Sequence, residues 1–362
     1  MDGRIEIDPD IRVARTLPAA CYRDPAFLER CRETVFARSW QLAADEETVA
    51  EPGRVHPFPF LDGCVDEPLL LARDRQGAVR CLSNVCTHRG NLVVQNPGSC
   101  TELKCAYHGR RFALDGSFEH MPEFKEAAGF PTKADDLPRL PLERWGMFLY
   151  TALRPACTFS EWSGEVARRL AGVALHGMRP DPTRSRDYEV RANWALYVDN
   201  YLEGFHIPFI HGGLNAELDY GSYATELFRR ANLQVGYAEG TEAVLDLPPG
   251  SPDRGRQVAA YYAWLFPNLM LNFYPWGLSI NIVKPLAVDR TRVTFLSYVR
   301  DESKLDRGAG AGLDRVELED EAVVEATQRG VRSRLYDRGR YSPTREQGVH
   351  HFHRLLAEAA NG

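Results

Sequence analysis

Two short stretches, Cys86-Thr87-His88 and Cys105-Ala106-Tyr107-His108, decide how the first half of this sequence folds. They follow the patterns C-x-H and C-x2-H, and sixteen residues separate them. Each stretch offers one thiol and one imidazole, so together they supply two sulfur and two nitrogen ligands for metal. Gly90 and Gly109 come just after the two stretches. Glycine permits the tight turns that bring backbone N–H groups close to a bound metal group.

This ligand set predicts a Rieske [2Fe-2S] cluster held by Cys86, His88, Cys105 and His108, in which two thiolates bind one iron and two imidazoles bind the other. A structural zinc ion is the alternative, because it also accepts two Cys and two His. Zinc sites usually pair Cys with Cys and His with His along the sequence. Each loop here pairs one Cys with one His, which favours the binuclear cluster.

A second metal pattern lies further along the chain. Segment 193–211, NWALYVDNYLEGFHIPFIH, contains His206 and His211 with four residues between them. Two His and one carboxylate form the facial triad of mononuclear non-haem Fe(II) sites, which leaves positions open for O₂ and for water that substrate displaces. The two His would not share a face of a straight helix, so we expect Pro208 to kink or end the helix. Two packed histidines at an aromatic helix end are the alternative, and the cluster motif favours iron.

The carboxylate must come from another segment. The run Leu318-Glu319-Asp320-Glu321 begins a helical pattern that continues to Gln328. We choose Asp320 as the third ligand, with Glu319 and Glu321 as alternatives. Acidic residues near the start of a helix often only complement its dipole, so spacing by itself leaves this choice open.

Length, charge and cysteine usage limit the classes of protein that this sequence can encode. A chain of 362 residues is long enough for two domains. A net charge of −6 gives no reason to expect nucleic acid or an anionic membrane as partner. The sequence begins without the apolar core of a signal peptide, and it has no apolar run long enough to span a bilayer. We therefore expect no membrane segment and a cytoplasmic location, with the remaining cysteines reduced.

The distribution of β-prone and helix-prone segments divides the chain into two domains and predicts an α+β fold. We predict an N-terminal antiparallel β domain over 38–154, where short β runs such as 68–72 and 78–82 surround the metal loops and Asp115-Gly116 marks a hairpin. Residues 1–37 and 155–362 form the second domain. Its predicted helices begin after Asp24 and cover 161–175, 193–211, 316–328 and 346–359, and its β region covers 261–282 and 292–299.

At these residues the sequence resembles the α subunits of Rieske non-haem iron oxygenases, also called aromatic-ring-hydroxylating oxygenases. Within that family it is most similar to the choline and carnitine monooxygenase branch. The resemblance covers nearly the whole chain and rests, beyond the metal motifs, on Asp199-Asn200-Tyr201-Leu202-Glu203, Phe266-Pro267-Asn268, Glu319-Asp320 and Gly348-Val349-His350-His351-Phe352-His353.

The resemblance implies a catalytic domain of helix-grip (START-like) fold with a curved antiparallel sheet, and assembly as a homotrimer. It also implies that Asp320, the Asp of the Glu-Asp pair, is the third iron ligand. Glu203 matches the carboxylate that bridges an iron-ligand His to a cluster His of the next subunit, which would be the partner subunit's His108. Arg110 departs from the family, because many relatives have Trp after His-Gly, and the effect on cluster solvation or reductase docking is open.

From the motifs and the resemblance together we expect the terminal oxygenase component of a Rieske system. It would use O₂ and electrons from a separate flavin or iron–sulfur reductase to hydroxylate a C–H bond of a small organic substrate. NAD(P)H would act only through that reductase, because the chain has no G-x-G-x-x-G nucleotide site. The preferred substrates are quaternary ammonium or N-methyl compounds, by monooxygenation or N-demethylation. An aromatic-ring or natural-product hydroxylase or dioxygenase is the alternative, and a Rieske electron carrier is a more distant one.

Aromatic side chains are the candidates for the substrate pocket. Aromatic rings attract a quaternary ammonium by roughly 0.5–2 kcal/mol per ring through cation–π contacts, and they would suit an aromatic substrate equally well. The expected lining residues are Tyr197, Tyr201, Phe205, Trp264 and Tyr274, with Tyr220, Tyr223, Phe273 and Trp276 as further candidates.

Overall fold

The computed structural model describes residues 3–173, 175–211, 221–238 and 243–362. The chain forms two compact units. The small unit is Trp40–Pro155, and the large unit combines Met1–Ser39 with Ala156–Gly362. The boundaries expected from sequence, 38–154 for the β domain, differ from the small unit by two residues at one end and one at the other.

The small unit consists of antiparallel strands and short 3-10 helices. Its sheets have the strand orders β1-β11-β10, β5-β2-β3-β4-β9 and β6-β7-β8. The strands are β1 (Gln41–Asp45), β2 (Arg54–Phe60), β3 (Glu67–Arg73), β4 (Val79–Ser83), β5 (Gly98–Ser99), β6 (Leu103–Lys104), β7 (Arg111–Phe112), β8 (Phe118–His120), β9 (Arg139–Leu140), β10 (Leu142–Trp145) and β11 (Phe148–Thr151), with 3-10 helices η3 (Glu46–Val49) and η4 (Lys133–Asp135).

Both metal loops of the small unit are held between strands. The first lies between β4 and β5, and the second joins β6 to β7. Cys86 and Cys105 belong to the same buried apolar cluster as Leu82 and Phe112, so the strands position the sulfur ligands in the interior. The hairpin expected at Asp115-Gly116 is confirmed, since β7 and β8 pair on either side of it.

The large unit contains one long sheet and several helices. Its strands are β12 (Arg179–Pro180), β13 (Arg186–Val190), β14 (Ala224–Leu227), β15 (Ala231–Tyr237), β16 (Val258–Leu265), β17 (Leu269–Tyr274), β18 (Gly277–Ala287) and β19 (Arg290–Val299). Its helices are η1 (Ala19–Tyr22), α1 (Pro25–Thr34), η2 (Phe36–Arg38), α2 (Phe159–Arg169), α3 (Trp194–Tyr201), α4 (Ile207–Ile210), η5 (Glu302–Lys304), η6 (Gly308–Gly310), α6 (Leu313–Gly330) and α7 (Gln347–Asn361).

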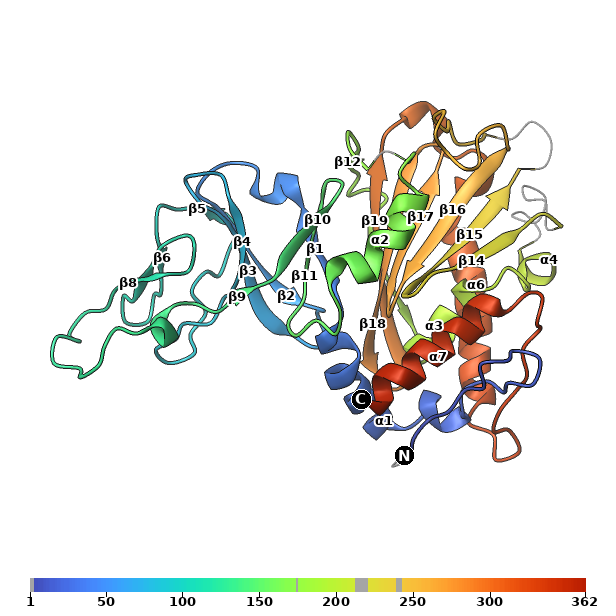
Figure 1. Ribbon diagram of the computed structural model, residues 1–362, viewed down its shortest axis with the longest axis horizontal. Helices are drawn as coiled ribbons and strands as arrows, with labels where there is room; N and C mark the ends of the chain where they lie inside the picture. Colours follow the sequence, from blue (N-terminus) through green and yellow to red (C-terminus); the bar gives the residue numbers. More distant parts are fainter. Residues whose placement is uncertain (1–2, 174, 212–220, 239–242) are drawn as a thin grey trace. The chain divides into compact units, whose positions relative to one another are not determined.

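The sheet runs in the order β12-β19-β18-β17-β16-β15-β14, and β13 also pairs with β19. Every pairing in it is antiparallel, and the strands from β15 to β19 follow one another as a meander. Helix α3 contacts β18, α6 and α7, and Figure 1 shows these helices lying along the sheet. The arrangement matches the expected α+β architecture, in which helices pack against one long antiparallel sheet.

Three hydrogen bonds join α3, with the residue that precedes it, to α6. The α3 partners recur every three or four residues and therefore share one side of the helix. We call this set the α3–α6 ladder. Its pairs are Asn193 N to Gln328 Oε1 at 2.8 Å, Tyr197 Oη to Glu317 Oε2 at 2.7 Å and Asn200 Nδ2 to Asp320 Oδ1 at 2.7 Å.

The prediction of a helix over 193–211 that kinks or ends at Pro208 is wrong, because the break comes earlier. Helix α3 ends at Tyr201, and a separate short helix, α4, begins at Ile207. The backbone N–H groups of Phe205 and His206 donate to the Glu203 carboxylate instead of to helical carbonyls. Pro208 then falls in the first turn of α4, where the missing N–H is harmless.

None of the described helices is both long enough and apolar enough to cross a lipid bilayer. The large unit instead buries its apolar side chains between α3, α7 and the sheet. Phe352 on α7 is fully buried, and its ring packs edge-on against Trp194 and Trp264 at 5.6 and 5.5 Å between centroids.

We predict that Phe352→Ala lowers the free energy of unfolding of the large unit by about 3–5 kcal/mol, because it leaves a cavity between two tryptophans. Chemical denaturation followed by tryptophan fluorescence measures this change. Leu335→Ala is the control, since Leu335 is 99% exposed and should change stability little. Equal stability of the two variants would contradict this account of the core.

Candidate active site

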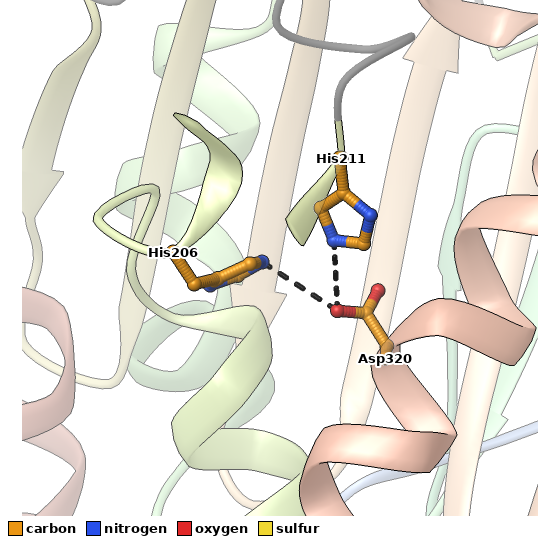
Figure 2. Close-up of side chains that lie close together, drawn as sticks. All are labelled: His206, His211 and Asp320. Atoms are coloured by element: carbon orange, nitrogen blue, oxygen red, sulfur yellow. Dashed lines mark hydrogen bonds and ion pairs between the residues drawn. The ribbon is translucent and has the colours of Figure 1, made fainter. Parts of the chain in front are cut away.

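Two histidines and one carboxylate from distant segments meet in the large unit. One ligand atom each from His206, His211 and Asp320 lies within 4.8 Å of the others. Both imidazoles offer Nε2 to the same oxygen, since Asp320 Oδ1 lies 3.5 Å from His206 Nε2 and 2.9 Å from His211 Nε2 (Figure 2). The structure therefore brings together the three residues expected to hold the mononuclear iron.

Glu203 fixes the orientation of His206. Its Oε1 lies 2.7 Å from His206 Nδ1, while its Oε2 accepts the backbone N–H of His206 at 3.0 Å. The imidazole is thus bound through Nδ1, which leaves Nε2 directed at Asp320. A carboxylate on the remote ring nitrogen is the usual partner of a metal-bound histidine, because it selects the tautomer and raises ligand basicity.

His211 is held in the same way by Glu319. The Glu319 Oε2 atom lies 2.7 Å from His211 Nδ1, and His211 is only 1% exposed. Burial disfavours the charged imidazolium, but the hydrogen bonds to Asp320 and Glu319 outweigh it and raise the pKa of His211. Glu319 is therefore an orienting partner of the site.

The choice among the three candidate acids of α6, Glu319, Asp320 and Glu321, depends on the direction in which each side chain points. Asp320 faces both histidines and receives a hydrogen bond from Asn200 Nδ2, which limits its rotation. Glu319 contacts only the far ring nitrogen of His211, and Glu321 is not among the described groups that converge on one point. Successive residues of a helix point about 100° apart, so one of three neighbours can face the histidines.

A cavity of about 120 Å³ opens beside these three residues. It lies between α3, α4, α6 and the sheet. Its lining residues are Tyr197, Asn200, Tyr201, Glu203, His206, Ile207, His211, Tyr223, Gln234, Tyr262, Asn272, Tyr274, Ser279, Asn281, Phe295, Ala309, Leu313, Val316, Glu317 and Asp320.

Strand register explains the polar wall of the cavity. Gln234, Tyr262, Asn272 and Ser279 stand directly opposite one another on four successive strands, so their side chains form one row across the sheet. Further hydrogen bonds anchor this row to Tyr201, whose hydroxyl donates to Asn272 Oδ1 at 2.7 Å and whose carbonyl accepts from Gln234 Nε2 at 2.7 Å.

The expected pocket aromatics divide into two groups. Tyr197, Tyr201, Tyr223 and Tyr274 line the cavity, whereas Tyr220 lies outside the described residues. The others lie away from this lining. Trp264 is in the core against Phe352, and Phe205 is 41% exposed beside Phe209. Phe273 precedes Tyr274 on β17 and therefore points to the opposite face of the sheet, and Trp276 stacks on Tyr274 with the ring centroids 5.4 Å apart.

Glu317 is a cavity residue that sequence reasoning missed. It lies one helical turn before Asp320 and is 5% exposed. Its Oε2 accepts a hydrogen bond from the Tyr197 hydroxyl at 2.7 Å, whereas its Oε1 is buried and has no partner in the part of the chain that the structure describes. Burial raises the pKa of Glu317 to about 8, with Asp320 and Glu321 adding repulsion and the Tyr197 hydrogen bond opposing them. The i, i+3 spacing from Asp320 could have shown that both acids share a helix face.

The cluster loops of the small unit place thiols inside and imidazoles near the surface. Cys86 and Cys105 are buried, and their thiols lie within hydrogen-bonding reach of each other. The His88 and His108 rings are half-buried, with centroids 4.7 Å apart. Asn91 Nδ2 lies 3.5 Å from Cys105 Sγ and can donate to it. Burial raises the pKa of the Cys105 thiol, but backbone N–H groups and Asn91 outweigh it and lower the pKa overall, which favours thiolate.

Arg110 is an internal residue of the small unit. It is 2% exposed, and its guanidinium carbon lies 5.0–5.6 Å from the ring centroids of Phe112, Phe118 and Phe130. One Nη donates to Asp135 Oδ1 at 2.7 Å and to the Asp135 carbonyl at 3.0 Å. Arg110 therefore affects the electrostatics beneath the cluster loops and offers no exposed group to a reductase.

Asp135 also connects the two cluster loops. Its carbonyl accepts from Thr87 Oγ1 at 2.8 Å as well as from Arg110. Thr87 stands between the first Cys and His ligands, and Arg110 follows the second pair. One backbone oxygen thus holds both loops in position.

Both donor sets fit the metals expected from sequence. Two thiols and two imidazoles in paired loops suit a Rieske cluster, because its two irons differ in ligand type. Two imidazoles and one carboxylate that converge from one side suit Fe(II) with open coordination positions. Besides Glu317, sequence reasoning missed Asn200 as the residue that holds Asp320, although it lies within the quoted family stretch.

Comparisons with known proteins agree with this geometry. Residues 39–132 match the Rieske [2Fe-2S] domain, and residues 179–362 match the ring hydroxylating alpha subunit (catalytic domain). The chain is 30% identical to the chloroplastic choline monooxygenase of Beta vulgaris, over 98% of this chain and 79% of that protein. It is 28% identical to the carnitine monooxygenase oxygenase subunit of Escherichia coli K12, over 95% of this chain and 94% of that protein.

Solved structures share the fold. The quaternary ammonium Rieske monooxygenase CntA, solved in complex with an inhibitor, superimposes with a TM-score of 0.78 at 23% identity, covering 98% of this chain and 99% of that chain. Naphthalene 1,2-dioxygenase from Rhodococcus sp. superimposes with a TM-score of 0.72 at 19% identity, covering 95% and 93%. Both domains of the chain match family models, and its relatives include monooxygenases. The chain therefore belongs to the Rieske non-haem iron oxygenases, as an α subunit of the ring-hydroxylating type.

Proposed function

We propose that this oxygenase hydroxylates or N-demethylates a small quaternary ammonium or N-methyl compound. The observation that carries the proposal is the cavity of tyrosines that opens directly on His206, His211 and Asp320. Electron-rich ring faces attract an ammonium group, so a bound N-methyl carbon would be held beside the metal ligands. The choline and carnitine monooxygenases among the relatives support the same substrate class.

Each residue around the metal has a positioning task in this proposal. Iron(II) held by the three ligands would supply the activation of O₂. Glu203 and Glu319 orient the two imidazoles, and Asn200 holds the Asp320 carboxylate. The cavity wall would place one C–H bond of the substrate toward the open coordination positions and exclude bulk water.

Electrons would come from a separate NAD(P)H-dependent flavin or iron–sulfur reductase to the cluster held by Cys86, His88, Cys105 and His108. Assembly as a homotrimer, with the Glu203 bridge to the partner subunit's His108, is part of the proposal. The carboxylate of Glu203 already binds His206 Nδ1, so it is suited to link that imidazole to a second one. The cytoplasmic location stays a prediction from the sequence.

An aromatic-ring or natural-product hydroxylase is the second candidate, because tyrosine faces also accept a planar substrate. A substrate panel with a compatible reductase separates the two. We expect formaldehyde or a hydroxylated product from quaternary ammonium or N-methyl compounds. Products only from aromatic hydrocarbons would overturn the proposal in favour of the second candidate.

We predict that His211→Ala lowers the iron content from about three to about two atoms per chain, because it removes one of three ligands of the mononuclear site and leaves the cluster intact. Metal analysis and the electron paramagnetic resonance signal of the reduced cluster measure the two effects. His176→Ala, an exposed histidine of the same unit, is the control. A variant that keeps full iron content and turnover would remove His211 from the site.

Glu203→Gln is expected to keep both metal centres but to slow electron delivery to the mononuclear site by about 10–100-fold, the usual cost of losing a carboxylate partner of a metal-bound histidine. Single-turnover oxidation of the pre-reduced cluster measures this rate. Glu302→Gln changes an exposed carboxylate and serves as the control. Unchanged single-turnover rates in Glu203→Gln would contradict the bridging role.

Arg110→Met should lower the reduction potential of the cluster, because a buried positive charge stabilises the added electron. A redox titration followed by electron paramagnetic resonance measures the potential without any turnover. Arg111→Met is the matched control, since the neighbouring Arg111 is partly exposed and solvent screens its charge. Equal potentials in the two variants would show that Arg110 acts only through packing.

A further inference from the structure

The described lining of the cavity beside the metal ligands contains acidic residues and two histidines. Three acidic residues line it: Glu203, Glu317 and Asp320. No Lys or Arg belongs to its lining within the described residues. Segments 212–220 and 239–242, which the structure does not describe, contain no Lys or Arg either. The described lining therefore offers no Lys or Arg side chain that could pair with an anionic substrate group.

Two of the three acids are already engaged. Asp320 faces His206 and His211 and accepts from Asn200. Both carboxylate oxygens of Glu203 are used, one by the His206 ring and one by backbone N–H groups.

Glu317 differs from them because half of its carboxyl group is free. The Tyr197 hydroxyl occupies Oε2, and Oε1 is buried with no hydrogen-bond partner among the described residues. A buried oxygen without a partner is unfavourable, and a cation bound in the cavity beside Glu317 offsets that cost through charge attraction.

The other polar groups of the cavity largely satisfy one another. Tyr223 Oη donates to Gln234 Oε1 at 3.3 Å, and Ser279 Oγ donates to Asn281 Oδ1 at 3.1 Å. Asn272 Nδ2 donates to the Ser279 carbonyl at 3.2 Å. Among the described lining residues, Glu317 is the one with a buried side-chain atom left unpaired.

We propose that Glu317 is the counter-charge for the positively charged nitrogen of the substrate, and that the cavity selects small cations without a carboxylate over zwitterions that carry one. This inference rests on the proposed function and names its substrate class more closely. Choline has the required chemistry, whereas the carboxylate of carnitine would enter a cavity whose described lining holds three acids and no Lys or Arg.

The ionisation behaviour of Glu317 agrees with this role. Burial, together with repulsion from Asp320 and Glu321, raises its pKa to about 8, so the empty cavity favours the neutral acid. A cation beside Oε1 stabilises the carboxylate, and a metal ion held by Asp320 offsets the repulsion from that residue. Glu317 can thus lose its proton and become a carboxylate when a cation enters the cavity.

Aromatic rings complete the recognition site. Tyr197, Tyr201, Tyr223, Tyr262 and Tyr274 all contribute to the lining. Ring faces and a buried carboxylate act in the same direction on a cation, because both present negative potential. A neutral molecule of equal shape would gain only the apolar contact.

The test compares three probes in binding to the oxidised holoenzyme by calorimetry: choline, L-carnitine and the neutral alcohol in which carbon replaces the ammonium nitrogen of choline. We expect choline to bind at least about tenfold more tightly than either of the others. Binding needs no reductase, so the result is independent of electron supply.

Glu317→Gln keeps the size of the side chain and an oxygen for Tyr197, and it removes only the charge. We expect the Kd for choline to rise about 30-fold or more while the Kd of the neutral alcohol changes little. With a reductase present, KM for choline should rise by a similar factor, and kcat should change less. Glu302→Gln removes the same charge from an exposed position outside the cavity lining and should leave both Kd values and the KM for choline unchanged.

Metal content and the cluster signal of Glu317→Gln must match the wild type, which separates a binding defect from misfolding. If the wild type binds and oxidises choline and Glu317→Gln does so equally well, the assignment of Glu317 fails and the proposed function stands. If L-carnitine binds the wild type as tightly as choline, the exclusion of carboxylates fails. If no quaternary ammonium or N-methyl compound binds or reacts, the inference and the proposed function fail together.

Discussion

The α3–α6 ladder is the constraint on which the active site depends. Two of its three hydrogen bonds are buried and the third, from Asn200 to Asp320, is partly buried, between two helices that lie far apart in the sequence. Buried polar groups cost free energy when they lose their partners. The two helices can therefore pack in one register only. That register places Asp320 opposite Asn200 and, one turn earlier, Glu317 opposite Tyr197. The proposed metal ligand and the proposed substrate counter-charge are thus positioned by the same contact.

The break after α3 supplies the second half of the geometry. Glu203 replaces the helical carbonyls as acceptor for two backbone N–H groups, so the chain turns without leaving those groups unpaired. The same carboxylate binds the ring of His206. Local structure and ligand orientation consequently depend on one side chain. Gly204 fits this turn because a Cβ there would lie 2.8 Å from the Tyr223 ring.

The sheet contributes an unusual polar wall. A row of Gln234, Tyr262, Asn272 and Ser279 crosses four strands on the face that meets the cavity, at positions where an antiparallel sheet over a core normally carries apolar residues. Because these groups bond to one another and to Tyr201, their polarity is largely satisfied internally. The unpaired oxygen of Glu317 is then the group with most to gain from a ligand.

The sequence by itself determined the metal chemistry, the two-part α+β architecture and most helices and strands, because ligand spacing and side-chain periodicity are local properties. It could identify Cys86, His88, Cys105 and His108 as one set and His206 with His211 as another. It could not choose by spacing among Glu319, Asp320 and Glu321, since direction on a helix matters only against a neighbour. Nor could it find the end of α3, where Glu203 competes with the helix, or Glu317 as a cavity residue. Only the tertiary structure decided these points, because each depends on which side chains the packed helices and the strand register bring face to face.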